Sequence, residues 1–176
     1  MTTDAAGSKS VPPQHKVNCG RIDMFIARDG RWFYHGTPIP RKEMVCLFAS
    51  TLERRPDGSY WLVTPCEEAE IGVEDVPFLA VELFKCNCGR NRTISFRTNV
   101  DEVVTLREPD QLRMASEGDS KPPYIRVREG IEARLTRSVY YELVGLGAEE
   151  AIGEERLFGV WSSGTFYPLG RMADLP

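Results

Sequence analysis

The sequence predicts an α+β fold in which a hairpin–helix–hairpin motif occurs twice, on either side of a strand-rich middle. Segments with the alternation and turn residues of β-hairpins flank one helical segment at 22–64 and another at 126–169. Between them lies a series of short β-branched segments separated by Gly, Asn, Asp and Pro, which is typical of an antiparallel sheet. The identity between the two motifs is weak, so the pattern alone leaves a true duplication open.

The first motif contains two Asp-Gly turns and one amphipathic helix. In IDMFIARDGRWFYHG, Asp29-Gly30 predicts a hairpin, because glycine adopts the positive φ of a type I′ turn at little cost. Asp57-Gly58 predicts a second hairpin, which leads into a strand at 60–64. Pro40 suits the first turn of the helix between them. Apolar residues then recur at helical spacing and predict one buried stripe, made of Met44, Val45, Leu47, Phe48 and Leu52.

The rest of the chain predicts a meander followed by the second motif. Five short strands are expected in EEAEIGV, PFLAVELFKC, RTISFRT, EVVTLR and QLRMA, and such a series favours a sandwich or a half-barrel. The polar segment 116–123 predicts an exposed loop. A strand in VREGIEARL, a helix in TRSVYYELVGLG and a closing hairpin in LFGVWSSGTFYPLG complete the expected order.

Composition and charge exclude some classes of partner. The 176 residues are 41% hydrophobic, enough to bury a core without metal or disulfide support. A net charge of −4 argues against a nucleic-acid polymer as the main partner. No segment approaches the roughly 20 apolar residues of a membrane helix, so no membrane insertion is expected. Residues 1–17 lack the apolar centre of a signal peptide; we interpret them as a disordered tail and expect a cytoplasmic protein.

No catalytic residues, no cofactor and no metal site are predicted. Neither serine of GVWSSGTFYPLG has the flanking glycines of a nucleophile elbow. Cys86 and Cys88 form a C-x-C, not the duplicated C-x-x-C of zinc sites; they favour two thiols at a hairpin end and leave a redox role open. An acidic cluster favours a solvated face over a cation-binding or acid–base site, and it comprises Glu67, Glu68, Glu70, Glu74 and Asp75.

The closing hairpin offers two interpretations. A turn at Ser163-Gly164 with Trp161 and Phe166 packed inward explains the segment by structure alone. Alternatively, Trp161 lines a cleft and the hydroxyls of Ser162 and Ser163 contact a ligand.

Two further segments also allow both a ligand-binding and a structural interpretation. Arg97, Thr98 and Asn99 could hold a phosphate or carboxylate, although Thr-Asn-Val-Asp is also good turn chemistry. Tyr140 follows Arg137 on the second predicted helix, where it either packs in the core or stacks on a planar ligand.

Several ordered blocks of the sequence together resemble the bacterial family DUF 1285, a domain of unknown function. The resemblance is carried by DMFIARDGRWFYHGTPIPRKEMVCLFASTLERRPDGSYWLVTP, VEDVPFLAVE, FRTNVDE, PYIRVREGIEARLTRSVYYEL and GVWSSGTFYPLG, and CNCGRNR departs from it. It implies a duplicated core and two lobes, which we place at 18–65 and 66–172. It also implies that the C-terminal lobe is a partly closed antiparallel barrel of the pleckstrin-homology (PH) type. A ligand site between the lobes, a nucleotide-like ligand and a role in signal transduction are implied as well.

We therefore expect a ligand-sensing or signalling domain without chemistry of its own. The expected ligand is a small anionic molecule, with nucleotide-like compounds among the candidates, bound between the two lobes. The arginines would hold its charge, an aromatic ring would stack on it, and hydroxyls and an amide would orient it. The alternatives are a protein–protein interaction adaptor and, more distantly, a metal-dependent enzyme. The oligomeric state is left open. The expected ligand-binding residues are Arg28, Arg97, Thr98, Asn99, Tyr140, Trp161, Ser162 and Ser163.

Overall fold

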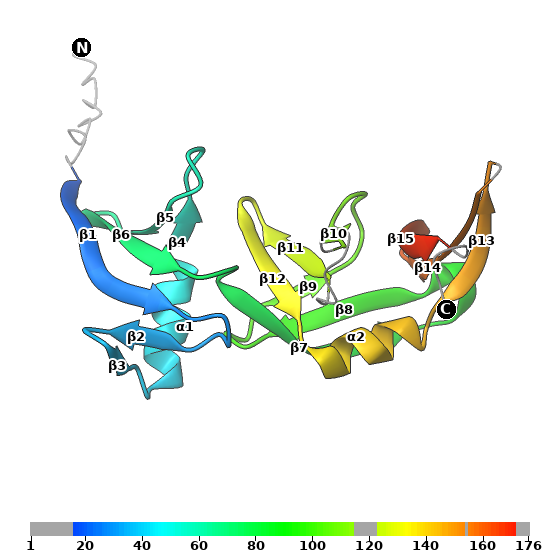
Figure 1. Cartoon of the computed structure of the whole chain (residues 1–176), viewed down its shortest axis with the longest axis horizontal. Helices are drawn as coiled ribbons and strands as arrows, with labels where there is room; N and C mark the ends of the chain where they lie inside the picture. Colours follow the sequence, from blue (N-terminus) through cyan, green and yellow to red (C-terminus); the bar gives the residue numbers. More distant parts are fainter. Residues whose placement is uncertain (1–15, 115–122, 154, 172–176) are drawn as a thin grey trace, which may run out of the picture.

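The computed structural model describes residues 16–114, 123–153 and 155–171, and these form three β-sheets and two α-helices. The sheets follow one another along the long axis of the molecule in chain order (Figure 1). The first fifteen residues of the predicted tail, and all but one residue of the predicted 116–123 loop, lie outside the described residues. No helix in the described part of the chain is long and apolar enough to cross a membrane.

The first sheet has six strands in the order β3-β2-β1-β6-β5-β4, and a helix packs against it. Its central strands β1 and β6 run parallel, whereas the neighbouring pairs are antiparallel hairpins. Its elements are β1 (Val17–Ile26), β2 (Trp32–Tyr34), β3 (Thr37–Pro38), α1 (Lys42–Ser50), β4 (Leu52–Arg54), β5 (Tyr60–Val63) and β6 (Glu67–Val73).

The second sheet repeats the strand order of the first without a helix inside it. Its order is β10-β11-β12-β7-β8-β9, and the central strands β7 and β12 again run parallel. In both sheets the first and last strands pair at the centre, and the hairpins extend outward. Its elements are β7 (Phe78–Cys86), the 3₁₀ turn η1 (Gly89–Asn91), β8 (Thr93–Thr98), β9 (Val103–Thr105), β10 (Leu112–Arg113), β11 (Tyr124–Arg128) and β12 (Ile131–Leu135).

The chain ends in a helix and a small antiparallel sheet. Helix α2 (Arg137–Val144) follows β12 and packs along β7. The third sheet has the order β13-β14-β15 and contacts β8 and η1 through its middle strand. Its strands are β13 (Ala148–Ile152), β14 (Glu155–Ser162) and β15 (Thr165–Arg171).

The predicted fold class is correct at the coarse level. The protein is mostly β with two helices, and one sheet curls into a half-barrel. The duplicated hairpin–helix–hairpin motif is not confirmed. The first motif lies within one sheet, whereas the second is divided between two sheets, with β11 and β12 in the second and β14 and β15 in the third. The predicted meander also differs in detail: its first expected strand, β6, belongs to the first sheet, and its second, β7, pairs in parallel with β12 of the second motif. The lobe boundary expected at 65/66 falls before β6, which belongs to the first sheet.

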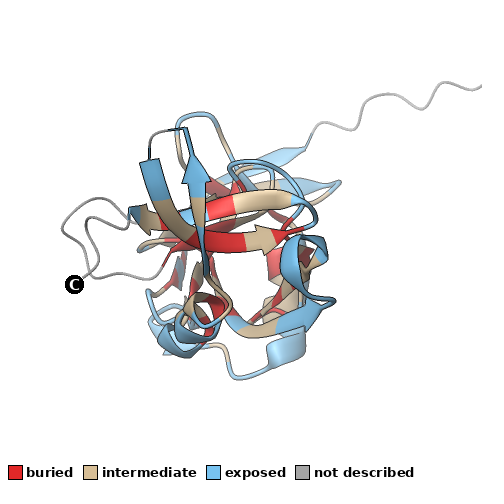
Figure 2. Cartoon of the chain, turned by 90° about the vertical axis from the view of Figure 1, so that its right-hand side faces the viewer, coloured by how far each residue is buried: buried red, intermediate tan, exposed pale blue. Residues whose placement is uncertain are grey.

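The local turn predictions are confirmed in the first sheet. Gly30 and Gly58 have φ of 80° and 88°, so both Asp-Gly pairs occupy turns that need a left-handed residue. Buried residues lie toward the middle of the molecule, while exposed residues lie toward its periphery (Figure 2). The largest fully buried side chains include Trp32, Phe78 and Phe96. One connected core therefore runs through all three sheets.

Helix α1 contacts the second sheet as well as the first. Lys42 Nζ donates a hydrogen bond to Asp101 Oδ1 at 2.8 Å, in the turn after β8. One turn along the helix, Cys46 Sγ lies 3.4 Å from the carbonyl oxygen of Val100 in the same turn. The helix thus connects the first sheet to the β8–β9 turn.

From the contact between Lys42 and Asp101 we predict a contribution to stability that depends on pH. The hydrogen bond from Lys42 lowers the pKa of Asp101 below its ordinary value. A lowered pKa in the folded state stabilises the fold above the unfolded value of about 3.9, and this contribution is lost as the pH falls through the lowered pKa. Replacing Lys42 with methionine should raise the pKa of Asp101 towards its ordinary value, as measured by NMR titration of the carboxyl carbon.

A second aspartate provides the control for this titration. A hydrogen bond from the backbone N–H of Arg31 lowers the pKa of Asp29, far from Lys42 in sequence. The pKa of Asp29 should therefore stay unchanged in Lys42→Met. An unchanged pKa of Asp101 in that variant would show that the ammonium group is not the cause of its shift.

Candidate functional site

Three of the predicted ligand-binding residues, Arg97, Thr98 and Asn99, lie together at the C-terminal end of β8 and form hydrogen bonds to other parts of the protein. Thr98 is fully buried, and its Oγ1 accepts a hydrogen bond from the backbone N–H of Glu102 at 3.1 Å. The side chain of Asn99 accepts from the N–H of Leu79 at 2.9 Å and donates to the carbonyl of Gly30 at 3.2 Å. Through these two hydrogen bonds, Asn99 connects the Asp29-Gly30 turn of the first sheet to the start of β7.

The two predicted arginines near this point already have carboxylate partners. Arg97 Nε donates to Glu82 Oε2 at 2.8 Å, and its guanidinium lies 3.5 Å from Asp101. Arg28 Nε lies 3.7 Å from Asp75 Oδ2. Asp75 also lies 3.6 Å from the guanidinium of Arg134. Each of the two predicted arginines therefore lies within 4.0 Å of a carboxylate of the protein.

Trp161, Ser162 and Ser163 of the closing hairpin form hydrogen bonds to other parts of the protein. Ser162 is fully buried; its Oγ accepts from the N–H of Ile94 at 2.9 Å and donates to the carbonyl of Leu106 at 2.7 Å. Ser163 occupies the turn with φ of 50°, and its N–H donates to the carbonyl of Arg92 at 2.7 Å. The indole N–H of Trp161 donates to Glu150 at 3.1 Å.

The predicted residues fall into separate groups along β8. Asn99 follows the C-terminal end of the strand, whereas Ser162 and Ser163 contact its N-terminal end through Ile94 and Arg92. Four residue steps separate Ile94 from Thr98, which is about 13 Å along a strand. Tyr140 is half-buried on α2 and stacks against Tyr141, with ring centroids 6.1 Å apart. Binding of a ligand by these eight residues stays a prediction.

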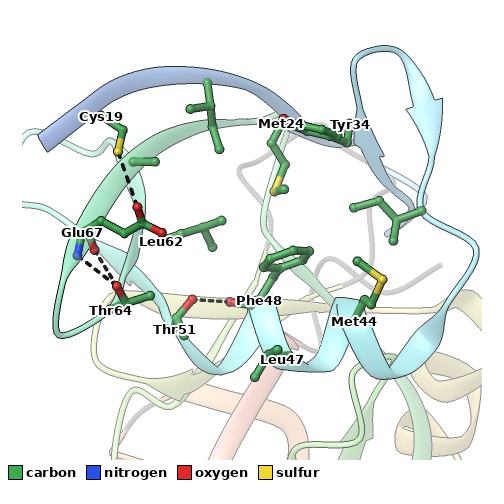
Figure 3. Close-up of a pocket in the computed structure, with 13 residues that line it drawn as sticks. Cys19, Met24, Tyr34, Met44, Leu47, Phe48, Thr51, Leu62, Thr64 and Glu67 are labelled. Carbon is green, nitrogen blue, oxygen red and sulfur yellow. Dashed lines mark hydrogen bonds between the residues drawn. The ribbon is translucent and has the colours of Figure 1, made fainter. Parts of the chain in front are cut away.

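A different part of the structure contains a substantial cavity. It measures about 570 Å³ and lies between α1 and the inner face of the first sheet (Figure 3). Strand β1 arches above the helix, so the sheet and the helix enclose the space from opposite sides. None of the eight predicted residues lines it. The lining residues are Cys19, Ile22, Met24, Tyr34, Ile39, Met44, Leu47, Phe48, Thr51, Leu62, Thr64, Glu67 and Ala69.

The strand register explains how the sheet supplies its part of the lining. Ile22 and Met24 are two residues apart on β1, so their side chains lie on the same face. Leu62 and Ala69 are cross-strand partners on β5 and β6. The polar residues Thr64 and Glu67 follow at the β5–β6 turn, where Thr64 Oγ1 donates to the carbonyl of Glu67 at 2.9 Å. The cavity therefore has apolar walls and one polar end.

The helix supplies the opposite wall. Met44, Leu47 and Phe48 belong to the apolar stripe that the sequence predicts to be buried, yet Met44 is 42% exposed and Leu47 is 65% exposed. The helical spacing identified the apolar stripe. It could not show that the first sheet leaves Met44 and Leu47 partly uncovered. The site is therefore recognised by an apolar helix stripe that is only partly covered by other side chains.

The described residues contain no group of three or more His, Cys, Asp or Glu side chains placed to hold a metal ion. All five cysteines are free thiols, and four of them are exposed: Cys19, Cys66, Cys86 and Cys88.

The comparisons with known proteins agree with the division into two units. Residues 12–76 match the family profile described as "Domain of unknown function (DUF1285), N-terminal domain". Residues 77–169 match "Protein of unknown function (DUF1285), C-terminal domain". The chain belongs to the DUF1285 family. The family resemblance in the sequence is thereby confirmed, and the boundary at 76/77 falls between β6 and β7.

Two solved structures of DUF1285 family proteins are similar to this chain. One, from Silicibacter pomeroyi DSS-3, is 41% identical, with a TM-score of 0.80, over 97% of this chain and 93% of its own. The other, from Shewanella baltica OS155, is 27% identical, with a TM-score of 0.59, over 70% of this chain and 91% of its own. Among curated proteins, no relative matches the chain.

Proposed function

We propose that this DUF1285 protein is a ligand-binding module without catalysis of its own, and that its ligand is a small apolar molecule bound between α1 and the first sheet. The observation that supports this function is the cavity of about 570 Å³ with apolar walls. Its size falls in the range of about 300–1,000 Å³ that is usual for small-molecule sites. A signalling role fits the position of α1, because the helix lines the cavity with one face and contacts the β8–β9 turn with another.

The cavity is a better supported site than the lobe interface. A small anionic or nucleotide-like ligand at the interface would have to displace carboxylates from Arg28 and Arg97. It would also have to break the hydrogen bonds of Asn99, which join the two sheets. A molecule in the cavity would displace only solvent from apolar side chains, which is favourable in proportion to the apolar area covered.

A cavity-filling variant tests the proposed site. Ala69 is half-buried on β6 and lines the cavity, so Ala69→Phe should occupy much of its volume. The neutral apolar fluorophore N-phenyl-1-naphthylamine should bind the wild-type protein saturably, with its affinity lowered at least tenfold in Ala69→Phe, a loss of about 1.4 kcal/mol. Fluorescence titration measures both affinities.

The matched control places the same ring on an exposed strand. Ala151 lies on β13 in the third sheet, so Ala151→Phe adds an equal volume without entering the cavity. This variant should bind the fluorophore as the wild type does. Equal binding by Ala69→Phe and wild type, or no saturable binding by the wild type, would refute the proposed site.

A protein-interaction adaptor is the second candidate function, and the rim of the cavity favours it. Leu47, Met44 and Tyr34 line the cavity and are 65%, 42% and 48% exposed. Apolar side chains at the rim of a groove are typical of sites that accept an amphipathic helix. In that case the variant Leu47→Lys would abolish partner binding, as measured by co-sedimentation with the partner.

Two finer features complete the proposal. A second unit of the PH-like barrel type, as the family resemblance implies, would be built from the second and third sheets with α2. A cytoplasmic location is in keeping with five cysteines that form no disulfide, because thiols stay reduced in that compartment.

A further inference from the structure

The two ends of the cavity differ in chemistry. Cys19, Thr64 and Glu67 lie at one end, whereas Met44 and Tyr34 lie at the other (Figure 3). Apolar side chains of the sheet and the helix, including Met24 and Phe48, occupy the length between them. A ligand that fills this space therefore meets a long apolar stretch with a carboxylate at one end.

The polar end carries an uncompensated negative charge. Among the described residues, the carboxylate of Glu67 has no basic side chain within 4.0 Å, and its Oε2 lies 3.9 Å from Cys19 Sγ. The next carboxylates along β6 differ in this respect, since Glu68 pairs with Arg55 at 2.7 Å and Glu70 lies 3.9 Å from Arg21. No lysine or arginine is among the described residues that line the cavity.

We infer that the ligand is a cationic amphiphile, with its alkyl chain along Met24 and Phe48 and its ammonium group beside Glu67. This inference rests on the proposed function of the cavity. An anionic headgroup at the same end would face Glu67 with no cation to balance either charge, and repulsion would oppose its binding. An ammonium group would form an ion pair with Glu67, and its chain would cover the apolar walls.

Matched eight-carbon compounds test the charge preference. Octyltrimethylammonium, 1-octanol and octanoate carry a positive, neutral and negative headgroup on chains of equal length. Each should displace N-phenyl-1-naphthylamine from the full-length protein, with affinity falling in that order and about five- to tenfold between the cation and the anion. Raising the salt concentration to 0.5 M should narrow this difference, because the exposed carboxylate is screened.

Two variants of equal charge change identify the carboxylate responsible. Glu67→Gln should abolish the preference for the cation over octanoate. Glu68→Gln should keep the preference, because that carboxylate is already paired with Arg55. A preference that persists in Glu67→Gln would overturn the inference.

The outcomes separate this inference from the proposed function. Equal binding of all three compounds to the wild type would overturn the charge preference and leave the apolar site standing. Failure of all three to displace the fluorophore would overturn both.

Discussion

Replacing Ser162 with alanine is expected to lower the free energy of unfolding by about 3 kcal/mol. The side chain is fully buried, and its hydroxyl joins the N–H of Ile94 to the carbonyl of Leu106. Alanine would leave both backbone groups buried without a partner, and each orphaned group costs about 1–3 kcal/mol. Urea denaturation of the variant and the wild type, with equal m-values, measures the difference.

Ser163→Ala is the matched control for this experiment. Ser163 is the next residue in the hairpin, is exposed, and contacts Arg92 only through its backbone N–H in the described structure. Its substitution should change stability by less than about 0.5 kcal/mol. A Ser162→Ala protein as stable as the wild type would show that the hydroxyl does not join β8 and the closing hairpin.

This expectation reflects an ambiguity that the sequence could not resolve. Two adjacent serines beside a tryptophan fit a ligand clamp and a structural turn equally well. The difference depends on Ile94 and Leu106, which precede Ser162 by 68 and 56 residues and leave no local signal. The same holds for Asn99, whose partners Leu79 and Gly30 are distant in sequence.

Local sequence signals were sufficient to predict much of the first sheet. The Asp-Gly turns, the helix after Pro40 and the strands beside them depend on backbone preferences within a few residues. The parallel pairing of β1 with β6 was not predicted, because each strand alone reads as part of a hairpin. This pairing moves β6 into the first sheet and brings Glu67 to the cavity.

The cavity could be predicted only in part, because its width depends on contacts between segments that are distant in sequence. Helical spacing identified the stripe that contains Met44, Leu47 and Phe48, but the width of the space above it depends on how β1 curves. A stripe that is fully packed and a stripe that is half open have the same sequence pattern.

Under the proposed function, helix α1 is the element through which a ligand in the cavity would affect the second unit. Its cavity face carries Met44 and Phe48, and its other face carries Lys42 and Cys46, which contact Asp101 and Val100. A ligand that contacts the first face can alter the second only if the helix moves as a body between two positions. The contacts at the C-terminal end of the helix add to those of Lys42 and Cys46 in joining the two units.

Arg128→Met is expected to lower the free energy of unfolding by about 2 to 3 kcal/mol, because Arg128 makes those contacts. From β11, its guanidinium pairs with Glu102 and donates to the carbonyls of Ala49 and Leu52, at 2.7 and 3.2 Å. These carbonyls lie at the end of α1 and the start of β4, so one side chain closes the helix terminus and joins the two sheets. Methionine keeps the apolar stem but satisfies none of these acceptors.

Arg126→Met supplies the comparison, since Arg126 lies on the same strand and pairs with a carboxylate in a more exposed position. Its partner is Glu108 at 2.8 Å, and the two side chains are 41% and 71% exposed. An exposed pair of this kind contributes about 0–1 kcal/mol, so this variant should unfold close to the wild-type denaturant concentration. Equal losses in the two variants would mean that Arg128 contributes only as a surface charge. A much larger loss in Arg128→Met would show that its hydrogen bonds to the end of α1 stabilise the fold.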